Sequence, residues 1–108
     1  MRSAFVVPQE CRCFGGEIML TVHKHHVELG DYFEIAMPKG AKILTVAEQH
    51  GLPCLWALVD TDKPIEKRLF RFAGTGHPIT ERPEHLQFVA TFQMQGGSLV
   101  FHIFEVVA

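Results

Sequence analysis

The stretch from Phe33 to Asp60 constrains the fold more than any other part of this chain. Its sequence, FEIAMPKGAKILTVAEQHGLPCLWALVD, contains three short apolar runs, which are separated by a Pro-Lys-Gly-Ala turn and a His-Gly-Leu-Pro turn. Apolar runs of about six residues between such turns are typical of β-strands. The stretch therefore predicts an antiparallel β fold, and it contains no catalytic signature.

An apolar period of two continues through most of the chain after Met19, and no long segment shows the 3.6-residue period of a helix. The predicted strands cover residues 20–29, 32–37, 42–49, 54–59, 67–73, 86–95 and 99–106. Short strands with regular turns between them are typical of small sandwiches and barrels. The sequence predicts an all-β domain, a six- to seven-stranded antiparallel sandwich or flattened barrel with little helix.

The strand patterns also predict how individual strands pair and face. Gly30-Asp31 suits a two-residue hairpin turn between the first two strands, because Gly adopts a positive φ without strain. Leu44 and Val46 are expected on one buried face, and the run 54–59 is apolar on both faces, which predicts a central strand covered on two sides. One buried face of strand 86–95 is expected to be formed by alternate residues, Leu86, Phe88, Ala90, Phe92 and Met94.

The length and composition are those of one globular domain. The chain has 108 residues, of which 47% are apolar and 20% are charged, and this balance excludes the disordered class. Residues 1–18 show no sustained period, and Gly15-Gly16 interrupts their end. We therefore expect residues 1–18 to be an irregular or mobile N-terminal arm and residues 19–108 to form a single β domain.

Charge and hydropathy argue against two classes of partner. The formal net charge is −2, whereas proteins that bind nucleic acid usually carry a basic excess. No apolar run reaches the roughly 18 residues that a transmembrane helix needs. We expect no nucleic-acid partner and no membrane partner. The start, MRSAFVVPQECRC, lacks the apolar core of a signal peptide, which predicts a cytoplasmic location.

The three cysteines are expected to be thiols rather than a disulfide framework, since their number is odd and the cytosol is reducing. Cys11 and Cys13 could bind a soft metal, but a second pair at the spacing of a zinc site is missing. Cys54 is interpreted as a small buried hydrophobe rather than a nucleophile, because the nearest histidine, His50, lies across a tight turn.

His23 and His25 are the candidate metal ligands. On a strand both side chains project to one face, with Cβ atoms about 7 Å apart, so two imidazoles can share a metal ion. A third ligand has to come from elsewhere, such as Glu28, His77 or His102. The alternative interpretation is a polar edge strand whose histidines are solvated, and we expect no metal or other cofactor.

The longest unpatterned stretch runs from residue 74 to 85, with the sequence GTGHPITERPEH. Its glycines let backbone N–H groups approach a phosphate, but a phosphate-binding loop normally opens a helix, which Pro78 does not allow here. Long loops on β scaffolds often carry function. The predicted ligand- or partner-binding residues are Thr75, His77, Glu81 and Arg82, and no catalytic residue is predicted.

Four separated segments resemble a family of small uncharacterised proteins found in bacteriophage and prophage genomes. They are MPKGAKIL at 37–44, HGLPCLWALVD at 50–60, GTGHPI at 74–79 and TFQMQGGSLVFHIFE at 91–105. The family has no established activity. The resemblance therefore implies an accessory protein of a phage or prophage that acts on the host or its defences, and it supplies no chemistry.

Together these patterns favour a non-enzymatic binding module that contacts another protein or a second copy of itself. Paired carboxylates, and a nucleophile with its base, are missing at recognisable spacing. Two strands are apolar on both faces, which is more apolar surface than one small core covers, so a homo-oligomer is expected. The alternative is a metal-dependent enzyme or a small-ligand-sequestering protein that uses the histidine cluster or the 74–82 loop.

Overall fold

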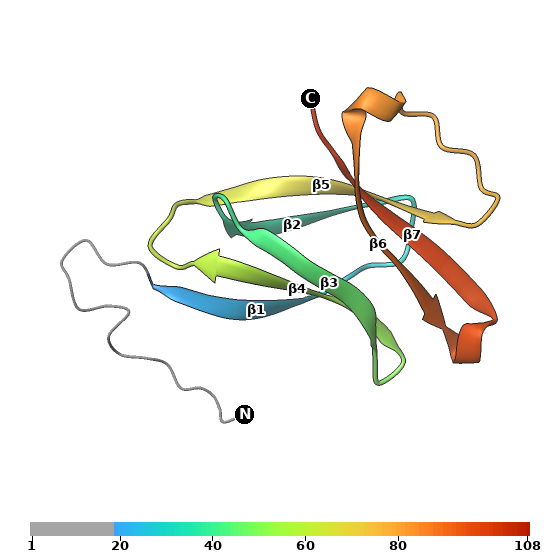
Figure 1. Cartoon of the computed structure of the whole chain (residues 1–108), viewed down its shortest axis with the longest axis horizontal. Helices are drawn as coiled ribbons and strands as arrows, with labels where there is room; N and C mark the ends of the chain where they lie inside the picture. Colours follow the sequence, from blue (N-terminus) through green and yellow to red (C-terminus); the bar gives the residue numbers. More distant parts are fainter. Residues whose placement is uncertain (1–18) are drawn as a thin grey trace.

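The structure is a computed structural model that describes residues 19–108, and within them it confirms the all-β prediction (Figure 1). The predicted arm at 1–18, with Cys11 and Cys13, lies outside the described residues. The strands are β1 (Leu20–His26), β2 (Tyr32–Pro38), β3 (Lys42–Gln49), β4 (Leu52–Asp60), β5 (Ile65–Gly74), β6 (Leu86–Met94) and β7 (Leu99–Val106). Two single 3-10 turns, η3 (Pro83–His85) and η4 (Gln95–Gly97), flank β6.

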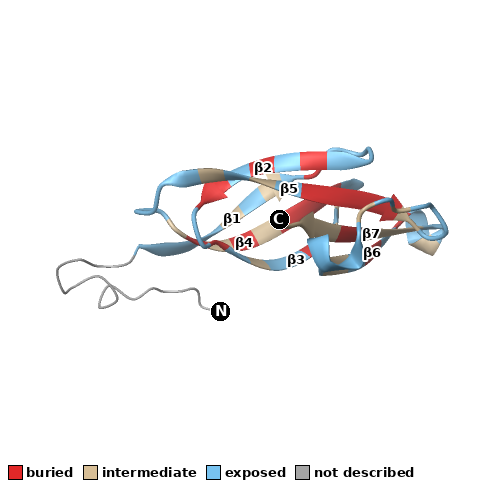
Figure 2. Cartoon of the chain, turned by 90° about the horizontal axis from the view of Figure 1, so that it is seen from above, coloured by how far each residue is buried: buried red, intermediate tan, exposed pale blue. Residues whose placement is uncertain are grey.

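The strands form two antiparallel sheets that pack face to face as a sandwich (Figure 2). One sheet has the order β1-β4-β3 and the other has the order β2-β5-β7-β6. No helix in residues 19–108 is long and apolar enough to cross a membrane.

The core lies between the sheets and is rich in phenylalanine. Phe33 stacks on Phe70 with ring centroids 5.0 Å apart, and Phe72 contacts both Phe92 and Phe101. Such aromatic pairs add to the stabilisation that comes from apolar burial. The buried apolar cluster comprises Val27, Phe33, Ile35, Met37, Ala41, Val46, Leu55, Ala57, Val59, Phe70, Phe72, Phe92, Met94 and Ile103.

The two long sides of the sandwich differ. On one side β3 packs against β6, and Ile43 and Val89 add to the core there. The other side ends in β1 and β2, and each of these is hydrogen-bonded to one of the other described strands. Alternate residues on β1 face inward at that side, and they are His23 and His25, both half-buried. We call these the β3/β6 side and the β1/β2 side.

The hairpin predicted around Gly30-Asp31 is wrong. The chain does turn there, and Gly30 has a φ of 151°. However, β1 pairs with β4 and β2 pairs with β5, so the two strands enter different sheets. A turn signal fixes where a chain reverses but not which strand it then pairs with. The buried residue Val27, which lies in the connection, contributes to the core instead.

Two predicted strand faces are also wrong, and a β-bulge explains each error. The register shifts between Ile43 and Thr45 on β3, so Leu44 is 48% exposed while Val46 is buried. A second shift lies between residues 88 and 90 on β6, so Phe88 is 61% exposed whereas Phe92 is buried. A bulge inserts one unpaired residue and reverses the side on which the following side chains lie.

The prediction for strand 54–59 is half correct. β4 is the central strand of its sheet, and Leu55, Ala57 and Val59 face the core. The opposite face is covered by no other described element, and Trp56 and Leu58 are half-buried on it. The apolar residues on that face therefore contribute to the surface of the domain.

Candidate functional site

The loop at 75–82 is anchored by a buried arginine of β5. Arg71 is 7% exposed, and its guanidinium donates hydrogen bonds to the carbonyl oxygens of Asp31, Phe72 and Pro78 at 2.8–3.1 Å. Its Nε lies 3.5 Å from a Glu81 oxygen, which is an ion pair rather than a hydrogen bond. A buried charge needs such partners, so Arg71 ties the loop to the sheet.

Tyr32 of β2 binds the carboxylate of Glu81 through its other oxygen. Its hydroxyl donates to the second carboxylate oxygen of Glu81, and the Arg71 guanidinium lies 5.2 Å from the centre of its ring. The Tyr32 hydrogen bond lowers the pKa of Glu81, with the Arg71 charge as a smaller contribution, and the same bond raises the pKa of Tyr32. Glu81 therefore stays ionised and is engaged within the fold.

His102 joins the start of the loop to β6 through two hydroxyl groups. Its Nε2 lies 2.7 Å from Thr75 Oγ1, and its Nδ1 lies 2.9 Å from Thr91 Oγ1. A hydroxyl group that is hydrogen-bonded to an imidazole resembles a nucleophile with its base. To activate the hydroxyl, however, the imidazole also needs a neighbouring group that stabilises its protonated form. Thr91 is neutral, so this chain of hydrogen bonds orients the ring without activating Thr75.

A pocket of about 370 Å³ lies beside this chain of bonds, between the loop and the β6–β7 turn. Thr75 and His77 are on one wall, and the other wall is largely apolar. His77 accepts a bond from the Gly74 N–H at 3.3 Å. The residues that line it are Gly74, Thr75, His77, Ser98, Leu99, Val100 and Phe101.

The four predicted site residues do not form one site. Thr75 and His77 share the pocket just described, whereas Glu81 contacts Arg71 and Tyr32 at the other end of the loop. Arg82 is exposed and pairs with Glu84 at 2.8 Å. Binding at these residues stays a prediction. The sequence pattern did not predict that Arg71 anchors the loop, because a charged residue between two phenylalanines on a strand is normally expected to be solvent-exposed.

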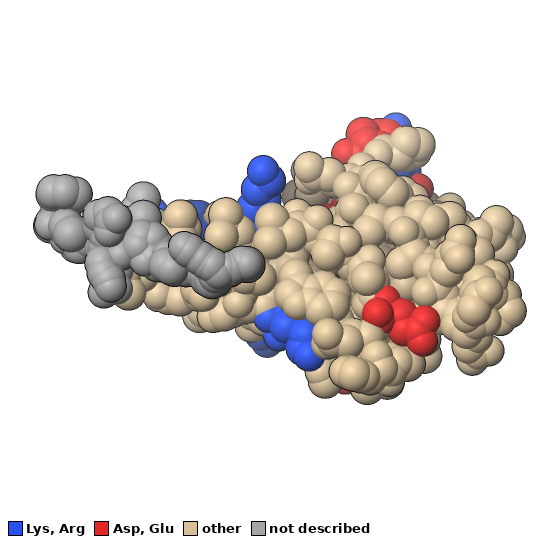
Figure 3. Space-filling view, turned by 60° about the horizontal axis from the view of Figure 1, so that its bottom comes forward, with Lys and Arg blue, Asp and Glu red and all other residues tan. Residues whose placement is uncertain are grey.

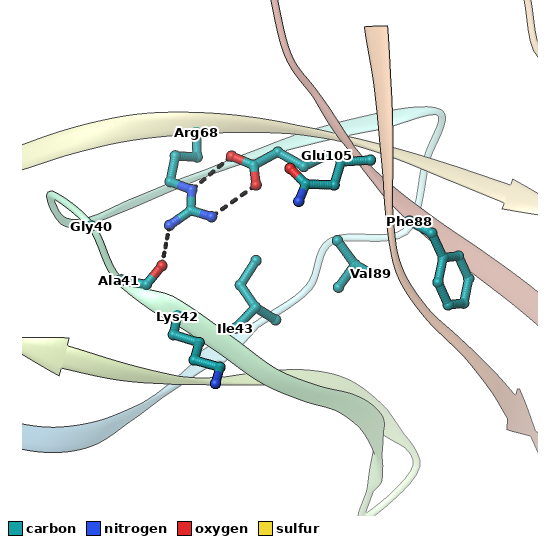
Figure 4. A pocket seen from close by; sticks show the side chains of 9 residues that line it. Gly40, Ala41, Lys42, Ile43, Arg68, Phe88, Val89 and Glu105 are labelled. Carbon is teal, nitrogen blue, oxygen red and sulfur yellow. Dashed lines mark hydrogen bonds and ion pairs between the residues drawn. The ribbon is translucent and has the colours of Figure 1, made fainter. Parts of the chain in front are cut away.

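A second pair of charges lies at the mouth of the sandwich on the β3/β6 side (Figure 4). Arg68 of β5 and Glu105 of β7 form a two-point ion pair with contacts of 2.7 and 2.8 Å. Arg68 also donates to the Ala41 carbonyl at 2.7 Å. The bond to Glu105 raises the pKa of Arg68 further. The pair therefore links both strands to the β2–β3 connection.

The pocket over this pair has a volume of about 370 Å³ and is built for packing rather than for chemistry. Ile43 and Val89 point toward one another across it, while Phe88 points away on the far side of β6 (Figure 4). Arg68 and Glu105 neutralise each other on its floor. A pocket with satisfied charges and two aliphatic walls offers few groups to orient a ligand.

The candidate metal ligands do lie together on β1. The rings of His23 and His25 are 6.2 Å apart, and His25 Nε2 is shielded without a hydrogen-bond partner. Burial lowers the pKa of His25, and the neighbouring His23 lowers it further. No group of three His, Cys, Asp or Glu side chains in residues 19–108 is arranged to hold a metal ion. Cys54 is buried in β4, and its thiol donates to the Leu52 carbonyl.

Exposed and half-buried apolar side chains also lie on the outer face of the β1-β4-β3 sheet. Register partners share a face, so Val22 of β1 lies beside Leu58 of β4, and Lys24 lies beside Trp56. Leu20 is 60% exposed, and Leu52 at the end of β4 is 54% exposed. Figure 3, which turns the lower side of Figure 1 forward, shows a surface with few charged side chains. We define the outer face as Leu20, Val22, Leu52, Trp56 and Leu58.

A protein-family model matches the whole described part of the chain. It is the domain of unknown function DUF7352, and the match covers residues 19–108. The chain belongs to the DUF7352 family. No curated protein and no solved structure matches the chain. The DUF7352 match therefore identifies the domain without assigning it an activity.

Proposed function

We propose that this DUF7352 domain is a non-enzymatic binding module that acts by contacting another protein or a second copy of itself. The observation that carries the proposal is the outer face of the β1-β4-β3 sheet, where exposed Val22 lies opposite half-buried Leu58, with Leu20 and Trp56 diagonal to that pair. Contiguous apolar surface around an aromatic residue is typical of protein interfaces.

The chemistry of the pockets supports the same proposal. Arg68, Arg71 and Glu81 are engaged with partners inside the domain, and the imidazole of His102 lies between two neutral hydroxyls. These groups stabilise strands and a loop, and none is aimed at a reacting centre. A role in contact is thus better supported than a role in catalysis.

The experiment is affinity capture from a bacterial lysate with the full chain and with the double variant Leu20→Ser/Val22→Ser. We expect a protein captured by the wild type to be lost from the variant, since two exposed apolar contacts are removed. Ile65→Ser is the matched control, because Ile65 is 64% exposed on β5 of the other sheet. A partner that the double variant keeps, or that the control loses equally, would refute the outer face as the contact surface.

The biological setting follows from the resemblance of four segments to phage and prophage proteins. We propose an accessory protein in the cytoplasm of a bacterial host that binds a host or host-defence component. Expression of the full chain in bacteria, followed by phage challenge, tests this role. A change in phage growth that Leu20→Ser/Val22→Ser abolishes is expected, and no change in either direction would contradict it.

The alternative, a metal-dependent or ligand-sequestering protein, keeps one observation in its favour, which is the His23–His25 pair at 6.2 Å. Two imidazoles are fewer ligands than a structural or catalytic zinc site uses. Elemental analysis of the purified chain separates the two functions. Stoichiometric zinc, iron or nickel that is lost in His25→Ala would support the alternative and overturn the binding module.

A further inference from the structure

Among residues 19–108, the backbone of β1 pairs with β4 alone, without a register shift, and its other edge is free. Thr61 N–H donates to the Met19 carbonyl at 2.9 Å, and Val27 N–H donates to the Pro53 carbonyl at 3.0 Å. Both pairs continue the β1–β4 register. Because hydrogen-bonded pairs alternate along an antiparallel ladder, the odd-numbered residues bond to β4. The even-numbered residues direct their N–H and C=O groups away from it, and these are Leu20, Val22, Lys24 and His26.

The other edge strands carry features that oppose pairing. β3 and β6 each contain a bulge and pack against each other. β2 ends in Pro38. The N–H of the next residue, Lys39, bonds inward to the Pro64 carbonyl, so the backbone nitrogen of Pro38 faces the free edge and has no N–H to donate there. β1 has neither a bulge nor a proline. Bulges and prolines are devices that keep sheet edges from pairing with other chains.

A lysine such as Lys24 ordinarily keeps other strands from pairing with an edge, but its side chain here points toward β3. Lys24 Nζ donates to Gln49 Oε1 at 2.8 Å, and Gln49 belongs to β3. The side chain therefore crosses the central strand β4 and leaves the free edge of β1 uncovered. A lysine deters pairing by its charge at the edge, so this contact reduces that protection.

We propose that β1 pairs antiparallel with β1 of a second copy of this chain, about a two-fold axis at His23, so that the two three-stranded sheets join into one. This inference deepens the proposed function by naming one partner and its contact. In this register Val22 opposes Lys24 of the second copy, and Leu20 opposes His26. Each copy thus places its apolar half against the basic half of the other, and no two lysines face each other.

Sedimentation velocity of the full chain, from 1 to about 200 µM, tests the proposal with three chains. We expect a monomer–dimer equilibrium for the wild type. Lys24→Pro removes one outward N–H from each copy and should weaken the dimer at least about tenfold. Ala36→Pro is the matched control, since Ala36 is exposed on β2 and its N–H also points to a free edge. It should leave the dimer unchanged.

A charge series tests the register without a proline. Val22→Lys places one lysine against Lys24 of the opposite copy in each of the two symmetric pairs and should weaken the dimer, whereas Val22→Glu should preserve or tighten it. Equal effects of the two variants would overturn the proposal. So would a wild type that stays monomeric throughout, whether β1 is then free or covered by residues 1–18, or a dimer that Lys24→Pro keeps. If Lys24→Pro loses the dimer but still captures a host protein, the β1–β1 contact and the outer face are two different contact surfaces.

Discussion

The two long sides of the sandwich show two ways to end a β-sheet. On the β3/β6 side, bulges turn both strands, aliphatic side chains meet, and the Arg68–Glu105 pair spans two strands of the larger sheet. On the β1/β2 side, β1 has no bulge and places His23 and His25 inward instead of apolar residues. The first side uses its side chains to complete the fold. The second leaves the outward backbone groups of β1 unpaired within residues 19–108.

The largest effect is expected where a bulge separates two phenylalanines on β6. Phe92→Ala should lower the free energy of unfolding by about 3–5 kcal/mol, because Phe92 is 6% exposed in the core. Phe88→Ala should cost about 1 kcal/mol, since Phe88 is 61% exposed and loses mainly its pairing with Phe104, at 5.8 Å between ring centroids. Urea unfolding measures both. Equal losses of unfolding free energy would mean that the bulge does not place Phe88 and Phe92 on opposite faces of β6.

The Arg68–Glu105 pair should matter less than the core but more than a surface pair. Arg68→Met leaves the carboxylate of Glu105 and the Ala41 carbonyl without their donor, and should cost roughly 3 kcal/mol. The comparison is Arg82→Met, which breaks an exposed pair with Glu84 and should change stability by about 0.5 kcal/mol or less. Similar values for both variants would contradict a structural role for the β3/β6 mouth.

The smallest effect is a pH dependence on the β1/β2 side. The pKa of His25 lies below 6.5 in the folded state, chiefly because of burial, so the unfolded chain binds a proton more readily. The contribution of His25 to stability is therefore complete above pH 6.5 and is lost as the pH falls toward the folded pKa. Urea unfolding at pH 7.5 and 5.5 should show a fall that His25→Gln reduces.

The exposed neighbour His26 is the control for that measurement. His26→Gln changes a histidine on the opposite face of the same strand and should leave the fall with pH as large as in the wild type. If His26→Gln reduces the fall in stability and His25→Gln does not, the burial of His25 is not the cause of the pH dependence.

The sequence predicted the class of fold because strand periods and turn residues are local signals. All seven strands begin and end within three residues of the predicted ranges. The sheet partners of the strands around Gly30-Asp31 were predicted wrongly, because pairing depends on contacts far along the chain. The faces of Leu44 and Phe88 were wrong because a bulge leaves no distinct residue pattern.

The site was harder to predict than the fold for a related reason. Thr75, His77, Glu81 and Arg82 were grouped because they are close in sequence, yet their contacts come from β2, β5, β7 and the loop itself. Arg71 and His102, which hold the loop, lie on strands where alternation predicts only an inward or outward position. The sequence shows which residues can bind one another, and only the sheet register shows which ones do.

Amide hydrogen exchange of β1 at several protein concentrations tests the central claim most directly. The account predicts that the odd-numbered amides from 21 to 27, which bond to β4, stay protected at every concentration. The amides of Leu20, Val22, Lys24 and His26 should gain protection only as concentration rises. Free exchange of these four amides at all concentrations would contradict the claim that β1 is a pairing edge.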